Sequence, residues 1–419
     1  MDGTGRNQMG GQTIAQKILS SHSGARAEVG EIVVCDIDLV MGHDANGPMA
    51  IRAFEKMGGT RVTNPEKVVF VMDHMGPAPF EKAANLQAVC RNFAAEQGTQ
   101  FMTIGEGVSH QIMAERGMAR PGGLVLGSDS HTCTLGAFGA FATGVGATDL
   151  AACLLTGRNW FRVPETLKIT FEGKLDPGCS TKDVILYVVG RVGADGGNYK
   201  SFEFYGDWLE DIGTADHMTL ANMLVEMGCK CGFVCHSNLG IEADPDAVYA
   251  EETVIDLTRI EPGLAKPHTV DNYAPISELV GMKVDQGFLG SCTNGRIEDI
   301  RIVAAILAGR KIHEDVRFIV TPASKAVHIQ AMAEGHIATL MEAGAVFFTP
   351  GCGGCVGTHG GVPADGEVVI SSANRNFRGR MGNSKASIYL ASPASVAAAM
   401  LTGVVTDPRM LAEQEGAHV

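Results

Sequence analysis

The sequence lacks the features that would place the protein in a membrane, outside the cell or on nucleic acid. No run reaches the roughly 18 apolar residues that a membrane-spanning helix needs. The first residues, 1–12, are polar and glycine-rich and contain no apolar core of a signal peptide. Positive charge is in deficit, because 33 Lys and Arg stand against 47 Asp and Glu, giving a net charge of −14. Binding a phosphate backbone needs a basic surface, so nucleic acid is not expected as the main partner.

Other absences limit the architecture. No period of about 20–50 residues repeats, which argues against a solenoid. With no secretory signal, the 11 cysteines indicate a reducing cytoplasm, where cysteines tend to be structural, catalytic or metal-binding. At 419 residues the chain is too long for one core, so we expect two or three domains. Its 53 glycines lie beside apolar runs, which indicates many tight turns.

Apolar strands alternate with helices, a pattern typical of parallel or mixed sheets covered on both faces. We therefore predict an α/β protein of three αβα units, at 1–162, 163–280 and 281–419. The polar, proline-interrupted stretch 236–277 is expected to be a long connection. Strands are expected at 31–40, 67–72, 101–104, 124–127, 164–171, 284–289, 317–320, 345–348 and 368–370. Helices are expected at 13–21, 81–97, 181–192, 217–227, 297–307 and 324–343, the last one capped by Ser324.

Four predicted strands run into polar clusters, and in open α/β sheets ligands bind at the carboxyl ends of strands. The clusters are Asp73-His74, residues 106–110, residues 128–132 and residues 371–380. A single histidine after a strand is more often structural. Three neighbourhoods of carboxylate and histidine in the same topological position favour an acid–base site.

Two sets of three cysteines compete as a metal site. Cys292 is set among glycines, as is the pair Cys352 and Cys355, each after an apolar run. Three thiolates can hold a cubane iron–sulfur cluster and leave one iron without a protein ligand, whereas structural zinc usually has four ligands. The rival set, Cys229, Cys231 and Cys235, alternates as a strand would, with all three side chains on one face. We favour the interpretation that these three cysteines act as small apolar residues facing a core. The singly placed cysteines are expected to be structural: Cys35, Cys90, Cys133, Cys153 and Cys179.

Four ordered motifs resemble the aconitase superfamily, and within it the large subunits of isopropylmalate dehydratase. They are Gly-Ser-Asp-Ser-His-Thr at 127–132, Gly-Ser-Cys-Thr-Asn-Gly at 290–295, Gly-Cys-Gly-Gly-Cys at 351–355 and Asn-Arg-Asn-Phe-Arg-Gly-Arg at 374–380. The resemblance covers nearly the whole chain. It implies αβα units around a central cleft, and a hydro-lyase that removes and re-adds water on a hydroxy-polycarboxylate, here in leucine biosynthesis.

The resemblance also assigns residues. It implies a [4Fe-4S] cluster on Cys292, Cys352 and Cys355, with one iron free to bind the leaving hydroxyl. The hydrogen-bonded catalytic pairs would be Asp73 with His74, His110 with Asp129, and His131 with Glu226. The substrate-binding residues would be His43, Ser130, Arg375 and Arg380, and the residues beside the cluster Asn222, Asn294 and Asn374. Asn222 and Glu226 are expected on one face of a helix, at i, i+4 spacing.

Relatives carry a further swivelling domain with the serine that acts as base and more arginines. The chain ends soon after the third unit, so we expect a separate small subunit to supply that domain. Gly354, Val356 and the segment 41–48 depart from the usual pattern, which leaves homoaconitate, 2,3-dimethylmalate and citramalate open as substrates. An iron-responsive RNA-binding protein and a zinc-bound structural protein are the alternatives of another class, and the acidic balance disfavours the former.

Overall fold

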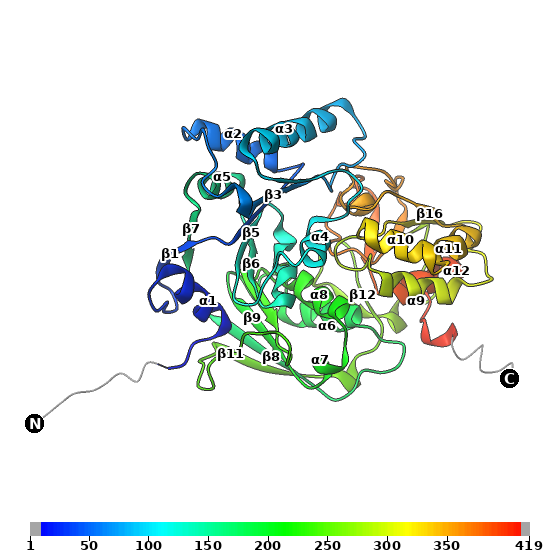
Figure 1. Ribbon diagram of the computed structural model, residues 1–419. Helices are drawn as coiled ribbons and strands as arrows, with labels where there is room; N and C mark the ends of the chain where they lie inside the picture. Colours follow the sequence, from blue (N-terminus) through cyan, green and yellow to red (C-terminus); the bar gives the residue numbers. More distant parts are fainter. Residues whose placement is uncertain (1–9, 412–419) are drawn as a thin grey trace, which may run out of the picture.

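The chain folds around four β-sheets, and the computed structural model describes residues 10–411 (Figure 1). Three sheets are large, with five, four and seven strands, and the fourth is a two-stranded ribbon. Helices connect most of the parallel neighbours, as crossover connections require. The predicted α/β class with parallel and mixed sheets is confirmed.

In chain order the strands are β1 (Ile32–Asp36), β2 (Leu39–His43), β3 (Val68–Val71), β4 (Gln100–Met102), β5 (Leu124–Gly127), β6 (Phe141–Gly144), β7 (Arg158–Arg162), β8 (Thr166–Glu172), β9 (Ser201–Tyr205), β10 (Cys231–Val234), β11 (Glu251–Asp256), β12 (Gly263–Ala265), β13 (Tyr273–Pro275), β14 (Gln286–Leu289), β15 (Arg317–Val320), β16 (Val346–Phe347), β17 (Val368–Ser371) and β18 (Ser387–Leu390).

The α-helices are α1 (Ile14–Ser23), α2 (Gly47–Lys56), α3 (Glu81–Gln97), α4 (Ser109–Glu115), α5 (Ala147–Thr156), α6 (Thr181–Val192), α7 (Trp208–Asp211), α8 (Thr214–Asn222), α9 (Ile297–Leu307), α10 (Lys325–Ala333), α11 (His336–Ala343) and α12 (Pro393–Thr402). Three 3-10 helices also bear on the site: η2 (Ser130–Phe138), η3 (Met223–Met227) and η6 (Gly353–Val356).

The five-stranded sheet has the order β4-β3-β2-β5-β6, and all of its neighbouring strands are parallel. Strand β3 is a continuous Val-Val-Phe-Val run, buried throughout because both faces of the sheet are covered. Phe70 packs into the core beneath α2, α3 and α5, whereas Val69 and Val71 pack with α4 and η2 on the other face. Parallel strands end at one edge, so the polar clusters that follow them gather there.

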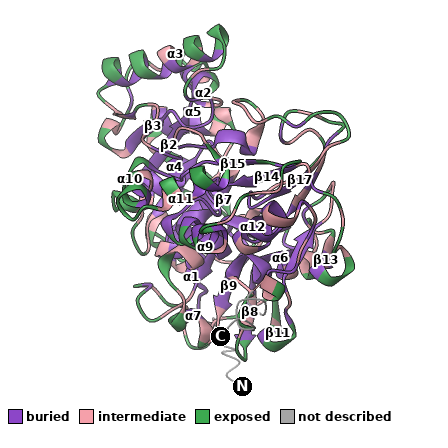
Figure 2. Ribbon diagram, turned by 90° about the vertical axis from the view of Figure 1, so that its right-hand side faces the viewer, coloured by how far each residue is buried: buried purple, intermediate pink, exposed green. Residues whose placement is uncertain are grey.

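The seven-stranded sheet has the order β13-β12-β18-β17-β14-β15-β16. Its five strands from β18 to β16 are parallel, and β12 and β13 add an antiparallel hairpin. Helices α9 to α12 lie against this sheet (Figure 1). In Figure 2 the strands β14, β15 and β17 are buried, while the outer turns of α3 and α10 are exposed. The third large sheet, β10-β9-β8-β11, is parallel throughout.

The division of the chain at residues 162 and 280 stays a prediction. The five-stranded sheet lies within the first predicted unit and the four-stranded sheet within the second. The hairpin β12–β13 precedes residue 281 but joins the seven-stranded sheet through Ala265 and Leu390. That sheet therefore draws on chain from both of the last two predicted units.

Some predicted element boundaries are wrong. The expected strand 31–40 is two strands, since β1 pairs with β7 and β2 enters the five-stranded sheet. The expected helix 324–343 breaks at Gly335, which has a φ of 81°, although Ser324 does cap α10 by accepting from the Val327 N–H. The stretch 236–277 holds β11, β12 and β13. Strand β11 is a largely exposed edge strand, so it lacks the apolar signature by which the buried strands were found.

No helix among residues 10–411 combines the length and the apolar character needed to cross a bilayer.

Candidate active site and metal centre

Three cysteines lie together at the carboxyl end of the seven-stranded sheet. Cys292 follows β14, and Cys352 and Cys355 follow β16. The two strands are parallel members of one sheet, separated by β15, so both loops lie at the same edge. All three side chains are buried. Burial raises the pKa of the Cys292 thiol well above its ordinary value and that of Cys352 to about 12. Uncharged thiols are therefore stable there until a metal ligates them.

Glycine is required at one point of the second loop. Gly353 has a φ of 54°, and a Cβ there would lie 2.3 Å from Thr321 Oγ1. Any side chain would be strained and would push the loop away from the strand end. The glycine between the two cysteines thus holds Cys352 and Cys355 close against the sheet.

Hydrogen-bond donors converge on the sulfur atoms. Asn222 Nδ2 donates to Cys292 Sγ at 3.1 Å, and Asn374 Nδ2 approaches the same sulfur at 3.4 Å. The guanidinium of Arg380 donates to Cys355 Sγ at 3.2 Å. Two amides and one cation directed at buried sulfurs stabilise thiolates far better than thiols.

This donor set fits an iron–sulfur cluster. Such clusters are held by cysteine thiolates, and N–H groups directed at the sulfurs are a normal part of the surroundings. The cysteines that would hold the cluster are Cys292, Cys352 and Cys355. The expectation that Asn222 and Asn374 lie beside the sulfurs agrees with these contacts. Asn294 faces away, since its amide donates to Asp299 at 2.9 Å.

Asp129 is the centre of the acid–base groups. Its Oδ2 lies 3.1 Å from His74 Nε2, and its Oδ1 lies 3.1 Å from His110 Nε2. The backbone N–H of His131 donates to Oδ1 at 2.6 Å. Burial opposes ionisation of Asp129, but the hydrogen bonds from the histidines outweigh it and hold its pKa well below the ordinary value. Asp129 is therefore a carboxylate surrounded by N–H donors.

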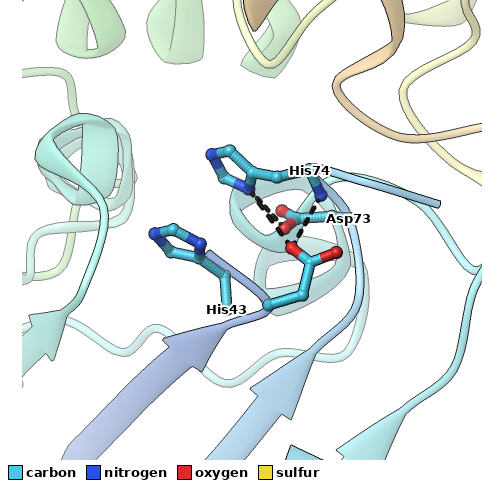
Figure 3. A group of neighbouring side chains, drawn as sticks. His43, Asp73 and His74 are labelled. Carbon is cyan, nitrogen blue, oxygen red and sulfur yellow. Dashed lines mark hydrogen bonds and ion pairs between the residues drawn. The ribbon is translucent and has the colours of Figure 1, made fainter. Parts of the chain in front are cut away.

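His74 lies between two carboxylates. Its Nδ1 is 2.6 Å from Asp73 Oδ1, and its ring stacks on that of His43 with centroids 4.0 Å apart (Figure 3). Both ring nitrogens face carboxylate oxygens, which suits an imidazolium that donates twice. Burial opposes the charge, but Cys352, Asp73 and Asp129 together raise the pKa of His74 well above its ordinary value. His74 is thus an imidazolium next to the cysteines, with a proton on each ring nitrogen.

His131 belongs to a separate pair. Its Nε2 lies 2.7 Å from Glu226 Oε1, and Arg375 Nε donates to both oxygens of Glu226 at 2.8 and 3.0 Å. Burial opposes ionisation, yet His131 and Arg375 hold the pKa of Glu226 below its ordinary value. The carboxylate accepts from Nε2 and so orients the ring, which brings Nδ1 to 3.4 Å from Ser130 Oγ.

The cluster of His43, Asp44, Asp73 and His74 could also be considered as a metal site, since possible ligand atoms lie within 4.8 Å of one another. Its carboxylates, however, are already engaged. Asp44 accepts from the backbone N–H groups of His74 and Met75 and from the Gln87 amide, and Asp73 accepts from Ser109 N as well as His74. We interpret the cluster as a hydrogen-bonded support for His74.

A cavity of about 520 Å³ opens beside these groups. Its lining comes from all three predicted units. The first contributes His74, Asp129 and Ser130, the second Val225 and Cys229, and the third Val356 and Arg375. The cavity therefore lies where the predicted units meet. Of the expected substrate-binding residues, His43, Ser130 and Arg375 line it and Arg380 does not.

The three predicted pairs are present as hydrogen-bonded neighbours, but one detail of the expected arrangement is wrong. Asn222 ends α8, and Glu226 lies in the 3-10 helix η3, so the two do not share a helix face. Gly228, with a φ of 80°, ends the tightened turn. Arg375 is paired with Glu226 and Arg380 with a sulfur, so neither guanidinium is wholly free for a substrate carboxylate.

The rival cysteine set does not form a site. Cys229 precedes β10 and packs in one core, whereas Cys231 and Cys235 pack in another, so the three side chains do not share a face. Their interpretation as core residues is confirmed.

Sequence reasoning missed three buried polar residues at the site. Asp44 supports His74, as described above. Arg296 donates to the backbone carbonyls of Cys292 and Thr293 at 2.6 and 2.5 Å and so shapes the first loop. Lys182, on α6, contacts the Cys292 loop through Asn294 and the segment after β17 through Ala373. Arg296 adjoins the 290–295 motif, whereas nothing in the local sequence marks Lys182.

The fold and the site together define an α/β protein of the aconitase type. A solved structure of aconitase X from Thermococcus kodakaraensis, in its holo form, superposes with a TM-score of 0.53 over 84% of this chain and 87% of that one. The two sequences are 12% identical, so this likeness concerns the fold alone. The model of the aconitase family (aconitate hydratase) matches residues 16–239 and 277–403. The chain belongs to the aconitase family.

Curated relatives align along nearly the whole chain. A 3-isopropylmalate dehydratase large subunit 1 from Methanopyrus kandleri is 46% identical over 95% of this chain and 99% of its own. The corresponding protein from Thermotoga maritima is 45% identical with the same coverage. A probable methanogen homoaconitase large subunit from Methanothermobacter thermautotrophicus is 45% identical over 94% of this chain and 97% of its own.

Proposed function

We propose that this chain is the large subunit of a two-subunit hydro-lyase that isomerises 3-isopropylmalate and 2-isopropylmalate by dehydration and rehydration, in leucine biosynthesis. The single observation that carries the proposal is the position of the sulfur centre. Three cysteines with N–H donors on their sulfurs lie next to a carboxylate–histidine network. The names of the relatives point to the same reaction and to a separate small subunit.

The cofactor is proposed to be a [4Fe-4S] cluster on Cys292, Cys352 and Cys355. When bound, it supplies a Lewis-acidic iron without a protein ligand, which activates the substrate's hydroxyl as a leaving group. No fourth cysteine is needed for this role. The other sulfur-facing groups, Asn222 and Arg380, hold the negative charge of the thiolates in place.

The chain's own residues handle the protons. His74, held as an imidazolium by Asp73 and Asp129, donates a proton to the departing hydroxyl. Asp129 keeps His110 oriented by accepting from Nε2. In rehydration His74 takes the proton back, so neutral His74 is the base for the incoming water, while Glu226 orients His131 by accepting from its Nε2.

The substrate's carboxylates need fixed cations on a chain of net charge −14. Arg375 lies in the cavity wall and can offer its outer N–H groups while Nε stays on Glu226. Ser130 and His43 line the same wall and would hold the substrate's polar groups. Arg380 donates to Cys355 Sγ and does not line the cavity. Its expected contact with substrate would require the guanidinium to donate to the sulfur and to a substrate carboxylate at once.

The base that removes the carbon-bound proton is proposed to come from the small, swivelling-domain subunit. Residues that surround the alkyl part of the substrate would then also be divided between the two chains. Homoaconitate is the second candidate substrate, because a homoaconitase large subunit is almost as similar to this chain as the isopropylmalate dehydratase subunits are. All 11 cysteines are free, as expected of a cytoplasmic protein.

Reconstitution of the purified chain with iron and sulfide, followed by assays with and without the small subunit, tests the proposal. We expect a visible absorption band from the chain alone, and turnover of 3-isopropylmalate only when the partner is added. A panel with homoaconitate, 2,3-dimethylmalate and citramalate separates the substrates. Full turnover by the chain alone would contradict the two-subunit arrangement. A colourless, iron-free chain after reconstitution would contradict the cluster.

A further inference from the structure

Lys182 is a buried cation that the acid–base groups do not use. It lies near the start of α6 and is only 1% exposed. Its ammonium donates to the backbone carbonyls of Ser372 and Ala373 at 2.7 and 2.8 Å and to Asn294 Oδ1 at 3.2 Å. All three acceptors are neutral. The ammonium therefore has hydrogen-bond acceptors, but none of them carries a negative charge to balance its own.

Within the described residues, no carboxylate forms a direct ion pair with this ammonium. Across the described residues 10–411, no carboxylate oxygen lies within 4.0 Å of the Lys182 ammonium. Fully buried lysines are rare unless they are paired, because removing an ammonium from water is unfavourable. In the absence of a partner, desolvation lowers the pKa of Lys182 to about 7.

The nearest carboxylates are occupied elsewhere. Asp299 accepts from the Asn294 amide and the Arg296 N–H, both at 2.9 Å. Asp183 accepts from Ser180 and from the Gly263 N–H. Burial raises the pKa of each carboxyl to about 6, so both are largely ionised at neutral pH, but each is held by its own N–H donors and neither is hydrogen-bonded to Lys182.

The remaining acidic groups near Lys182 are the thiols of Cys355 and Cys292. The acceptors of its ammonium belong to the loops around them. Asn294 is two residues after Cys292, and Ser372 and Ala373 directly precede Asn374, whose amide approaches Cys292 Sγ. The ammonium thus joins two loops that surround the sulfur centre and adds a positive charge behind it.

We propose that Lys182 is the internal counter-cation of the sulfur centre, positioned so that its buried charge is offset when the three cysteines ligate a cluster. This inference rests on the cluster proposed above. A cubane cluster held by three thiolates carries net negative charge, which matches a single cation. Lys182 touches neither substrate nor sulfur, so it is a positioning residue that acts through the loops and through its field.

The field has a measurable consequence. Reduction adds negative charge to the centre, so a buried cation stabilises the reduced form and raises the midpoint potential. Lys182→Gln keeps an N–H donor for the carbonyls and removes the charge, and Lys182→Met removes both. Lys283→Met is the matched control. The Lys283 side chain is 69% exposed and pairs with Asp285, and its loss changes the net charge of the protein by the same amount.

The experiment is an anaerobic redox titration, followed by electron paramagnetic resonance, of the reconstituted wild type and the three variants. We expect a more negative midpoint potential for Lys182→Gln and for Lys182→Met, and the wild-type value for Lys283→Met. An unchanged potential in a fully loaded Lys182→Gln overturns the inference. If wild type itself takes up no cluster, the proposed function fails first, so the two failures are distinguishable.

Thermal unfolding of the cluster-free proteins covers the case in which Lys182→Gln takes up no cluster. Cluster-free Lys182→Gln that melts with the wild type but fails to load supports a role directed at the centre. A cluster-free variant that melts well below the wild type, or does not fold, shows that Lys182 is a structural tie between the loops and overturns the inference.

Discussion

Two regions of this chain each gather three cysteines, and only one of them is built as a ligand site. Cys229, Cys231 and Cys235 are closer in sequence, within seven residues of β10 and its flanks, yet they divide between two cores. Cys292, Cys352 and Cys355 are up to 63 positions apart (355 − 292) and lie at one sheet edge. The latter set has amide and guanidinium donors on its sulfurs and an imidazolium beside it. Whether three cysteines form a ligand site therefore depends more on the surroundings of their sulfur atoms than on their proximity in sequence.

The strongest test of this contrast is to remove one cysteine from each region. Cys352→Ala should abolish cluster uptake and with it the turnover of the two-subunit enzyme, because two thiolates do not hold the cluster. Cys231→Ala removes an equally buried sulfur and should retain wild-type iron content, at a cost of about 1 kcal/mol in stability for the small cavity. Iron analysis and visible absorption measure the outcome. Loss of iron in Cys231→Ala would overturn the contrast.

A second test compares buried carboxylates. Asp129→Asn removes the anion that His74 and His110 share, so we expect turnover to fall by about 10²- to 10⁴-fold with the visible band retained. Glu203 is the matched residue near Cys235, where it accepts from Tyr205, Tyr249 and the Ile14 N–H. Glu203→Gln should lower the melting temperature and leave turnover of the folded fraction unchanged.

Unchanged turnover per folded molecule in Asp129→Asn would show that Asp129 matters through stability alone. A steady-state assay corrected for iron content, with circular dichroism for folding, gives both quantities.

The smallest expected effect is a pH dependence confined to the core cysteines. Burial raises the pKa of Cys231 from 9.0 to about 12. A folded pKa above the unfolded one means that the stabilisation is complete below pH 9 and is lost as pH rises towards 12. The free energy of unfolding in urea should therefore fall by about 1 kcal/mol per raised thiol between pH 8 and pH 10. In Cys231→Ala this fall should be smaller than in the wild type by the contribution of that one thiol. Ligated cysteines are already ionised and contribute no such slope in the loaded protein, so identical slopes for wild type and Cys231→Ala would contradict the burial argument.

Much of the site could be predicted because its groups follow strands. Asp73-His74, His110 and the 128–132 cluster each come after an apolar run, and parallel strands bring their ends to one edge. The pairing of His131 with Glu226, 95 residues apart, came from resemblance to a family, since no local pattern links the two. The elements that were misjudged depend on contacts instead. Strand β11 is polar because it lies at a sheet edge, and the 3-10 helix η3 carries Glu226 where a continuous helix was expected.

The sequence by itself determined the α/β class, the cysteines that could ligate a cluster and the carboxylate–histidine neighbourhoods, because each is written in residues adjacent along the chain. Only the tertiary structure decided which sulfurs receive N–H donors, that Arg380 faces Cys355 rather than the cavity, and that Lys182 lies behind the centre. These depend on side chains from different units meeting in a low-dielectric interior. There, a charge is stabilised or destabilised by neighbours that are remote in sequence.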